Sequence, residues 1–376
     1  MTRRVLAFAV SLLAGPVMAQ GYGSLEDLGE ALFFDVNLSL NRTQSCATCH
    51  DPDFAFVDPR ETELGRMVSL GDDGVSLGDR NAPTAAYAMF TPRFQKLDPG
   101  VYMGGMFLDG REPDLAGQAG GPPLNPLEMA MPDKASVVAR LRENDAYVEA
   151  FEALFGAEIW EDADAAYRAM TEAIAAFEMT EVFAPFDSKY DRYLRGEVAL
   201  TEEEDLGRQL FFSEEFTNCS LCHQLRPSPI AADETFSNYE YHNIGVPVNE
   251  TVRSVTGFND IDRGLWSHPA VEEPETLGQF KVPTLRNVAV TGPYMHNGVF
   301  DDLRTVVLFY NIYNTRDPQW LINPETGAPF RPPEVPATLS VEELTHGPAL
   351  DDRRIDALVA FMETLTDARY EHLLDD

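Results

Sequence analysis

One five-residue pattern occurs twice in this chain and constrains its fold more than any other feature. Two cysteines separated by two residues are followed at once by a histidine, at residues 46–50 (C-A-T-C-H) and again at residues 219–223 (C-S-L-C-H). These are the only 4 cysteines among 376 residues. The pattern is typical of covalent haem c attachment, in which both thiols bind the porphyrin and the histidine is the proximal iron ligand. The sequence therefore predicts two haem c groups, with these attachment residues and proximal ligands: Cys46, Cys49 and His50 for the first, and Cys219, Cys222 and His223 for the second.

Two other uses of the cysteines remain open from the sequence. Pairs of the form C-x-x-C also bind zinc, and four cysteines in an exported chain could form two disulfides. Neither use calls for a histidine directly after both pairs, and a redox-active dithiol would need only one pair. Haem attachment accounts for the whole pattern.

The N-terminus has the three parts of an export signal. Arg3 and Arg4 precede an apolar run over 5–17, and Val17-Met18-Ala19 is a small-residue cleavage site. We therefore predict a signal peptide at residues 1–19 and a periplasmic location, with an uncleaved anchor as the alternative. No later segment is apolar for long enough to cross a bilayer, so no membrane span is expected.

Acidic residues greatly outnumber basic ones. The chain has 62 Asp and Glu against 28 Lys and Arg, a formal net charge of −34. Such a surface repels nucleic acid, so no nucleic-acid partner is expected. It is either simply well solvated or suited to a basic protein partner at low salt.

A second repeat precedes each haem motif. Residues 28–34 and 206–212 both read L-G-x-x-L-F-F, with apolar residues at helical spacing. Thr201 and Glu204 form a capping-box pattern before the second copy. The repeat indicates duplication, so we predict a mainly α fold of two tandem cytochrome c-like domains with one c-type haem each. The predicted boundaries are 20–185 for the N-terminal domain, which carries the first haem, and 186–376 for the C-terminal domain, which carries the second.

Three further segments have the periodicity of amphipathic helices. They are residues 135–155, 163–183 and a closing helix over 353–374. Two Pro- and Gly-rich stretches, 117–132 and 318–336, are expected to be loops.

The distribution of histidines bears on the sixth coordination position of each iron. Of 7 histidines, only His50 precedes His223, so the first half has no second histidine to close its own haem. This favours an open iron that can bind peroxide. Methionine remains possible as a ligand there, and the candidates in that half are Met67, Met89, Met103, Met106, Met129 and Met131.

Six short motifs add a family resemblance. They are R-N-A-P-T (80–84), D-G-R (109–111), P-L-N-P-L-E-M (123–129), F-D through Y-L-R-G (186–196), F-K-V-P-T-L-R-N (280–287) and T-G-P-Y-M-H-N-G (291–298). With two haem motifs, they make nearly the whole mature chain resemble the bacterial di-haem cytochrome c peroxidase superfamily, most of all its MauG-like branch.

The resemblance implies a function. A MauG-like enzyme uses hydrogen peroxide to form a high-valent di-haem state and oxidises Trp or Tyr residues of a partner protein in the periplasm. The alternatives are a classical cytochrome c peroxidase, which reduces peroxide with electrons from a small cytochrome, and a non-catalytic electron-transfer cytochrome.

The resemblance also implies catalytic residues. Gln118, Pro122 and Glu128 match the residues that the family places over the open face of the first haem. Glu128 suits an acid-base role, because cleavage of the O–O bond needs a proton moved between its oxygens, and its apolar neighbours would favour the neutral carboxyl. A solvated loop carboxylate is the alternative reading.

The sixth ligand of the second haem distinguishes the branches. The family position that holds methionine in classical peroxidases falls on Tyr310, where MauG-like proteins also have tyrosine. A phenolate ligand favours oxidised iron, whereas a thioether favours ferrous iron. Tyr313 or a methionine is the competing ligand.

Two further family features can be checked against the sequence. The family binds one Ca²⁺ between the haems through an amide and two carbonyls, which match Asn81, Thr291 and Pro293. The family usually has a tryptophan directly before D-G-R, but here that residue is Leu108, so any electron path between the haems must use other residues.

Overall fold

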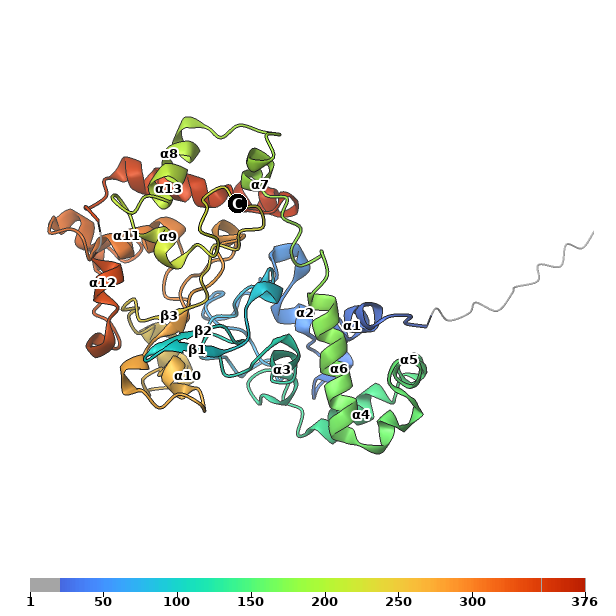
Figure 1. The fold of residues 1–376 in the computed structure, drawn as a ribbon. Helices are drawn as coiled ribbons and strands as arrows, with labels where there is room; N and C mark the ends of the chain where they lie inside the picture. Colours follow the sequence, from blue (N-terminus) through green and yellow to red (C-terminus); the bar gives the residue numbers. More distant parts are fainter. Residues whose placement is uncertain (1–20, 346, 376) are drawn as a thin grey trace, which may run out of the picture.

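The structure is a computed structural model that describes residues 21–345 and 347–375. The predicted signal peptide, residues 1–19, lies outside the described residues. Within them the fold is mainly α, with three small two-stranded sheets (Figure 1). The helices are α1 (Leu25–Phe33), α2 (Cys46–Cys49), α3 (Leu115–Ala119), α4 (Lys134–Leu141), α5 (Asp145–Phe155), α6 (Ala163–Glu178), α7 (Lys189–Leu194), α8 (Glu202–Phe211), α9 (Cys219–Cys222), α10 (Glu250–Thr256), α11 (Leu303–Asn311), α12 (Val341–Leu344) and α13 (Asp352–Glu363). The strands are β1 (Gln95–Asp98), β2 (Val101–Met103), β3 (Tyr241–His242), β4 (Phe280–Lys281), β5 (Ile322–Asn323) and β6 (Ala328–Pro329).

The repeated L-G-x-x-L-F-F segments form α1 and the second half of α8, and each helix packs against a later one. Helix α1 packs against α6, and α8 packs against α13. The glycine of the repeat has a steric reason, because a Cβ on Gly29 would lie 1.9 Å from the Ala173 carbonyl oxygen and one on Gly207 would lie 1.8 Å from that of Ala357. Both helix pairs therefore make the same close approach at a glycine.

The sequence predicted the positions of the helices more accurately than it predicted the residues at which they begin and end. The capping box at Thr201 is confirmed, since its hydroxyl accepts a hydrogen bond from the Glu204 amide and the Glu204 carboxylate accepts one from the Thr201 amide. The single helix predicted over 135–155 is wrong, because Asn144 caps the start of a separate helix, α5. Helix α6 ends at Glu178 and α13 at Glu363, earlier than predicted, and a 3-10 helix, η11 (Ala368–Asp375), follows α13.

Each half has its own hydrophobic core. One core consists of residues between 28 and 184, and the other of residues between 190 and 365. Figure 1 shows α1, α3, α4, α5 and α6 on one side of the molecule and α8, α11, α12 and α13 on the other. This grouping agrees with the duplication inferred from the sequence.

The sheets and several side chains join the two halves. Strand β2 follows β1 in an antiparallel pair, and the Gly104 amide, directly after β2, donates to the Tyr239 carbonyl over 2.9 Å. The Arg80 guanidinium bonds Asp109 over 2.8 Å and Asp262 over 2.7 Å. The halves therefore meet over polar contacts as well as apolar ones.

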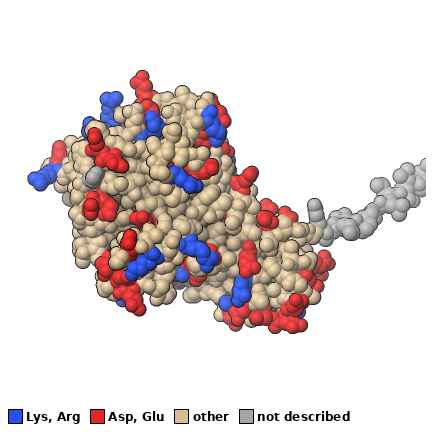
Figure 2. All heavy atoms as spheres, viewed as in Figure 1, with Lys and Arg blue, Asp and Glu red and all other residues tan. Residues whose placement is uncertain are grey.

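Charged side chains are spread over the surface (Figure 2), with acidic ones in excess. Figure 2 shows acidic side chains scattered over the face drawn, and they gather on the lobe that α4 and α5 form. None of the described helices is both long and apolar enough to cross a lipid bilayer.

Candidate active site

Each C-x-x-C-H motif forms one turn of helix that is capped by its histidine. The His50 amide donates to the Cys46 carbonyl over 2.9 Å, and the His223 amide donates to the Cys219 carbonyl over 2.8 Å. A single turn brings both sulfurs of a pair to one side, as attachment to two vinyl groups of one porphyrin requires. The four cysteines form no disulfide within the described residues, so the disulfide alternative is wrong.

The two histidines have matching surroundings. His50 Nδ1 lies 3.1 Å from the Phe56 carbonyl oxygen, and His223 Nδ1 lies 3.2 Å from that of Phe236. Because a carbonyl only accepts, Nδ1 carries the proton and Nε2 is available to a metal. Burial lowers the pKa of both histidines, that of His223 to about 4, so both imidazoles are neutral, the form that binds iron.

A single cavity of about 840 Å³ joins the two motifs. Its wall includes Cys49 and His50 of the first motif and Cys219, Cys222 and His223 of the second. Most of its exposed lining is apolar, which suits porphyrin rings. Within residues 21–345 and 347–375, no three His, Cys, Asp or Glu side chains are grouped as a metal-ion site.

The three residues expected over the first haem all line this cavity. Gln118 comes from α3, Pro122 begins a short 3-10 helix, and Glu128 lies in the turn after it. Burial raises the pKa of Glu128, the largest influence on that carboxyl. The Asn125 side-chain amide donates to Glu128 Oε1 over 2.6 Å, which leaves Oε2 for a proton.

Most of the candidate methionines do not line the cavity. Of the six in the first half, only Met106 lines it, and Met129 and Met131 are buried in the first hydrophobic core. His242 and His296 also line the cavity, and both come from the second half of the chain. The ring of His296 is stacked on that of Phe280, with 3.7 Å between ring centres.

Tyr310 and Tyr313 differ in what their hydroxyls contact. Tyr310, on α11, lines the cavity with Cys219, Cys222 and His223, and its hydroxyl makes no hydrogen bond to any described residue. Burial raises its pKa, and no cation among the described residues lies beside it to stabilise the phenolate. The Tyr313 hydroxyl instead donates to the Ile244 carbonyl over 3.0 Å, and Tyr313 is not part of the cavity wall.

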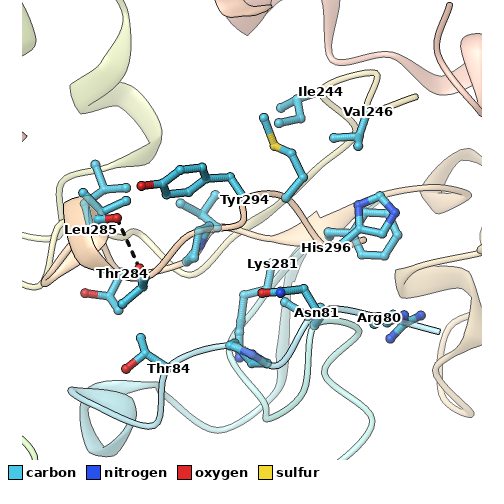
Figure 3. A pocket seen from close by; sticks show the side chains of 18 of the residues that line it. Arg80, Asn81, Thr84, Ile244, Val246, Lys281, Thr284, Leu285, Tyr294 and His296 are labelled. Carbon is cyan, nitrogen blue, oxygen red and sulfur yellow. Dashed lines mark hydrogen bonds between the residues drawn. The ribbon is translucent and has the colours of Figure 1, made fainter. Parts of the chain in front are cut away.

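The three residues predicted to bind calcium also line the cavity, where the two halves meet. The Asn81 side-chain nitrogen donates to the Met67 carbonyl over 3.2 Å, so its amide oxygen is free to accept. The carbonyls of Thr291 and Pro293 accept no hydrogen bond from a described residue. Figure 3 shows Asn81 close to Lys281 and opposite His296, so the first and second halves face each other here.

Leu108 lies where the two halves are joined. It lines the cavity, and its carbonyl accepts the Lys281 amide over 3.0 Å. Phe107 also lines the cavity, with the Arg111 guanidinium 3.6 Å from its ring centre. Tyr102 belongs to a separate apolar cluster.

Two titratable groups of the cavity wall, Glu178 and Lys281, were missed by sequence reasoning. Glu178 ends α6 as a fully buried carboxyl whose Oε2 has no partner among the described residues, and burial raises its pKa to about 8. Lys281, whose ammonium donates to the Gly105 carbonyl, has a pKa lowered to about 8 by burial. A charged residue on the apolar face of a predicted helix was the available signal for Glu178.

Comparisons with known proteins agree with this geometry. Residues 24–199 match the family described as di-haem cytochrome c peroxidase. Over 355 residues the chain is 57% identical to the methylamine utilization protein MauG of Paracoccus denitrificans, covering 94% of this chain and 91% of that protein. This chain belongs to the di-haem cytochrome c peroxidase family. The family resemblance predicted from the motifs is therefore confirmed.

Other relatives include peroxidases. The cytochrome c peroxidase Ccp of Escherichia coli is 34% identical over 72% of this chain and 49% of that protein. The crystal structure of the di-haem peroxidase BthA from Burkholderia thailandensis has a TM-score of 0.83 at 33% identity, covering 92% of this chain and 86% of that one. Membership of this family makes the chain a di-haem peroxidase or related oxidoreductase and implies two haem c groups.

Proposed function

We propose that this chain is a MauG-like periplasmic enzyme that reduces hydrogen peroxide and takes the electrons from Trp or Tyr side chains of a partner protein. The observation that carries the proposal is the unequal lining of the cavity. The first motif faces an acid-base carboxyl, whereas the second has the unpaired phenol of Tyr310 beside it. The 57% identity to a MauG protein supports the same assignment.

The residues over the first motif would manage protons. Reduction of H₂O₂ to two waters consumes two protons and two electrons, and bound haem iron supplies the redox chemistry that cleaves the O–O bond. Glu128 holds its proton at Oε2, because Asn125 occupies Oε1 and burial favours the neutral acid. Gln118 can orient the peroxide by hydrogen bonding, and Pro122 adds an apolar surface without an N–H donor.

The second motif would hold a haem through Cys219 and Cys222, with His223 and Tyr310 as the residues that would bind its iron. Tyr310 has a free hydroxyl in the cavity, whereas the hydroxyl of Tyr313 is already bonded. The raised pKa of the Tyr310 phenol means that only a strong Lewis acid such as ferric iron would hold it as phenolate. Such a ligand suits a haem that stores an oxidising equivalent.

We propose a Ca²⁺ ion between the two halves, bound by Asn81, Thr291 and Pro293. Three oxygens without a donor partner suit a hard cation that prefers oxygen ligands. Since Asn81 comes from residues 20–185 and the others from 186–376, the ion would fix the predicted domains relative to each other.

The test is electron paramagnetic resonance of the resting ferric holoprotein. We expect one high-spin and one low-spin haem, and we expect Tyr310→Phe to alter the low-spin signal alone. The matched control, Tyr313→Phe, removes a bonded phenol three residues away and should leave both signals unchanged. Two low-spin haems in the wild-type protein would instead support an electron-transfer cytochrome.

The choice between the enzyme alternatives rests on the electron donor. A partner protein incubated with peroxide and this enzyme should gain an oxidative mass change at Trp or Tyr, detected by peptide mass spectrometry. Fast peroxide turnover with a reduced small cytochrome, and no such mass change, would support a classical cytochrome c peroxidase instead.

A further inference from the structure

A third sequence repeat follows the helices that close each half. Asp187-Ser188-Lys189-Tyr190 comes after α6, and Asp367-Ala368-Arg369-Tyr370 comes after α13, so both segments read D-x-(K/R)-Y. Helices α6 and α13 are equivalent in the duplicated fold, since each packs against one L-G-x-x-L-F-F helix. The two segments, 187–190 and 367–370, are therefore equivalent trailing segments.

Each trailing segment contacts the loop that follows the haem motif of the other repeat. The Tyr370 hydroxyl donates over 2.8 Å to the carbonyl of Pro52, just after His50. The Tyr190 hydroxyl donates over 2.7 Å to the carbonyl of Pro229, a few residues after His223. Both tyrosines are 1% exposed, so neither bond competes with bulk water.

These bonds fix the loops that orient the histidines. Pro52 begins the loop that leads to Phe56, and Pro229 lies in the loop that leads to Phe236; these are the phenylalanines whose carbonyls face Nδ1 of His50 and His223. Both have a φ of 56°, in the left-handed region that a side chain disfavours. Such a conformation persists only where neighbouring groups hold it.

Aromatic contacts extend the same crossed pattern. The Arg369 guanidinium carbon lies 5.3 Å from the centre of the Phe56 ring, and its Nη2 donates to the Val182 carbonyl. The Tyr190 ring meets the Phe236 ring edge-on, with 5.9 Å between centres. Each trailing segment thus touches the phenylalanine of the other repeat.

The two trailing segments are also bonded to one another. The Ala368 amide donates to Asp187 Oδ1 over 2.9 Å. Asp367 accepts the Tyr87 hydroxyl over 2.6 Å and the Asn287 side-chain amide over 2.8 Å. Tyr87 and Asn287 come from opposite halves, so Asp367 bonds to both halves. Together with the bond between Ala368 and Asp187, it connects the two trailing segments that support the histidine loops.

We propose that the two trailing segments are crossed positioning elements, in which Tyr370 orients His50 and Tyr190 orients His223. This rests on the proposed haem attachment, because it assigns the two histidines as iron ligands. A hydrogen bond from Nδ1 to a carbonyl makes the imidazole a stronger donor to a metal. Removal of the tyrosine hydroxyl frees the carbonyl loop, weakens that bond and should raise the reduction potential of the haem concerned.

The experiment compares Tyr370→Phe, Tyr190→Phe and a control, Tyr193→Phe, in the holoprotein. Each change removes one hydroxyl, and the Tyr193 hydroxyl donates to no described residue. Haem content is measured first, and the two midpoint potentials are then measured by spectroelectrochemical titration. The haem whose signal responds to Tyr310→Phe identifies the second site.

We expect Tyr370→Phe to move only the first-haem potential to more positive values, Tyr190→Phe only the second, and Tyr193→Phe neither. The inference is overturned if both variants move the same haem, or if neither moves any while two haems remain bound. Failure of the proposed function is distinguishable, since it would show as fewer than two haems in the wild-type protein or no response to Tyr310→Phe.

Discussion

Two carboxyls in the wall of the cavity differ in how they are held. Glu128 has Asn125 as a partner for one oxygen, whereas Oε2 of Glu178 has none among the described residues. Burial raises the pKa of both, which favours neutral acids that can donate protons. At the scale of single residues, the largely apolar cavity thus has two carboxyl groups in its wall, Glu128 and Glu178, whose protonated forms are favoured.

Replacing Glu128 by glutamine should lower kcat for peroxide reduction. The amide keeps the size of the side chain and removes its exchangeable acid proton, and general acid-base groups contribute about 10²–10⁴-fold. Stopped-flow reaction with peroxide measures the loss. Glu112→Gln, outside the cavity, is the control. An unchanged rate in Glu128→Gln would exclude the acid-base role.

Glu178 should make stability depend on pH. The unfolded carboxyl loses its proton near pH 4.5, whereas the folded one keeps it to about pH 8. The folded state therefore binds more protons across this window, and the free energy of unfolding should fall by a few kcal/mol as pH rises through it. Denaturant titrations at several pH values should show a flatter profile in Glu178→Gln. The exposed Glu172→Gln, on the same helix, should keep the wild-type slope.

At the scale of elements, two glycines set how closely the helix pairs pack. The Cβ positions built at Gly29 and Gly207 both fall within 2 Å of a carbonyl oxygen of the partner helix. The L-G-x-x-L-F-F repeat predicted two equivalent helices, because its apolar residues have helical spacing. The sequence did not reveal why the repeat has a glycine, since the partner helices α6 and α13 are distant in the chain.

Gly207→Ala and Gly29→Ala should each destabilise the protein by about 1–3 kcal/mol, because an added methyl group forces two packed helices apart. Thermal or denaturant unfolding measures the change. At Gly23 the nearest atom would be 3.8 Å from an added Cβ, so Gly23→Ala should have little effect. Equal stability of all three variants would contradict the close approach seen here.

Sequence reasoning predicted some features of this protein and missed others for physical reasons. The haem motifs, the family and the mainly α fold follow from local patterns. The helix break at Asn144 was missed because a capping side chain overrides apolar periodicity there. The buried Lys281, the partnership of Asn125 with Glu128 and the crossed tyrosines depend on contacts between distant segments, which periodicity does not report.

At the scale of the whole molecule, a buried ionic cluster joins the halves. Arg80 bonds Asp109 and Asp262, with side chains 17%, 4% and 12% exposed. Removing Arg80 from this cluster is costly, because Asp262 would lose its ion-pair partner in a poorly solvated place, whereas Asp109 keeps the Arg111 guanidinium. The contact fixes how the two ends of the cavity face each other.

Arg80→Met should therefore lower the free energy of unfolding by about 3–5 kcal/mol. The control is Arg42→Met, since Arg42 and its partner Glu143 are 46% and 47% exposed, and the loss there should be at most about 1 kcal/mol. Urea denaturation of the holoproteins measures both. Similar small losses in the two variants would show that the cluster does not stabilise the interface.

The reach of Tyr370 to Pro52 has a consequence for biogenesis. The first cysteine pair precedes Tyr370, the tyrosine that supports its histidine, by most of the described chain, so a ribosome makes the pair long before the tyrosine. In a nascent or prematurely terminated chain, Tyr370 would be absent, and the loop after His50 would lack this hydrogen bond. Arrival of the second half of the chain, rather than folding of the first half alone, would decide when that centre acquires its final geometry.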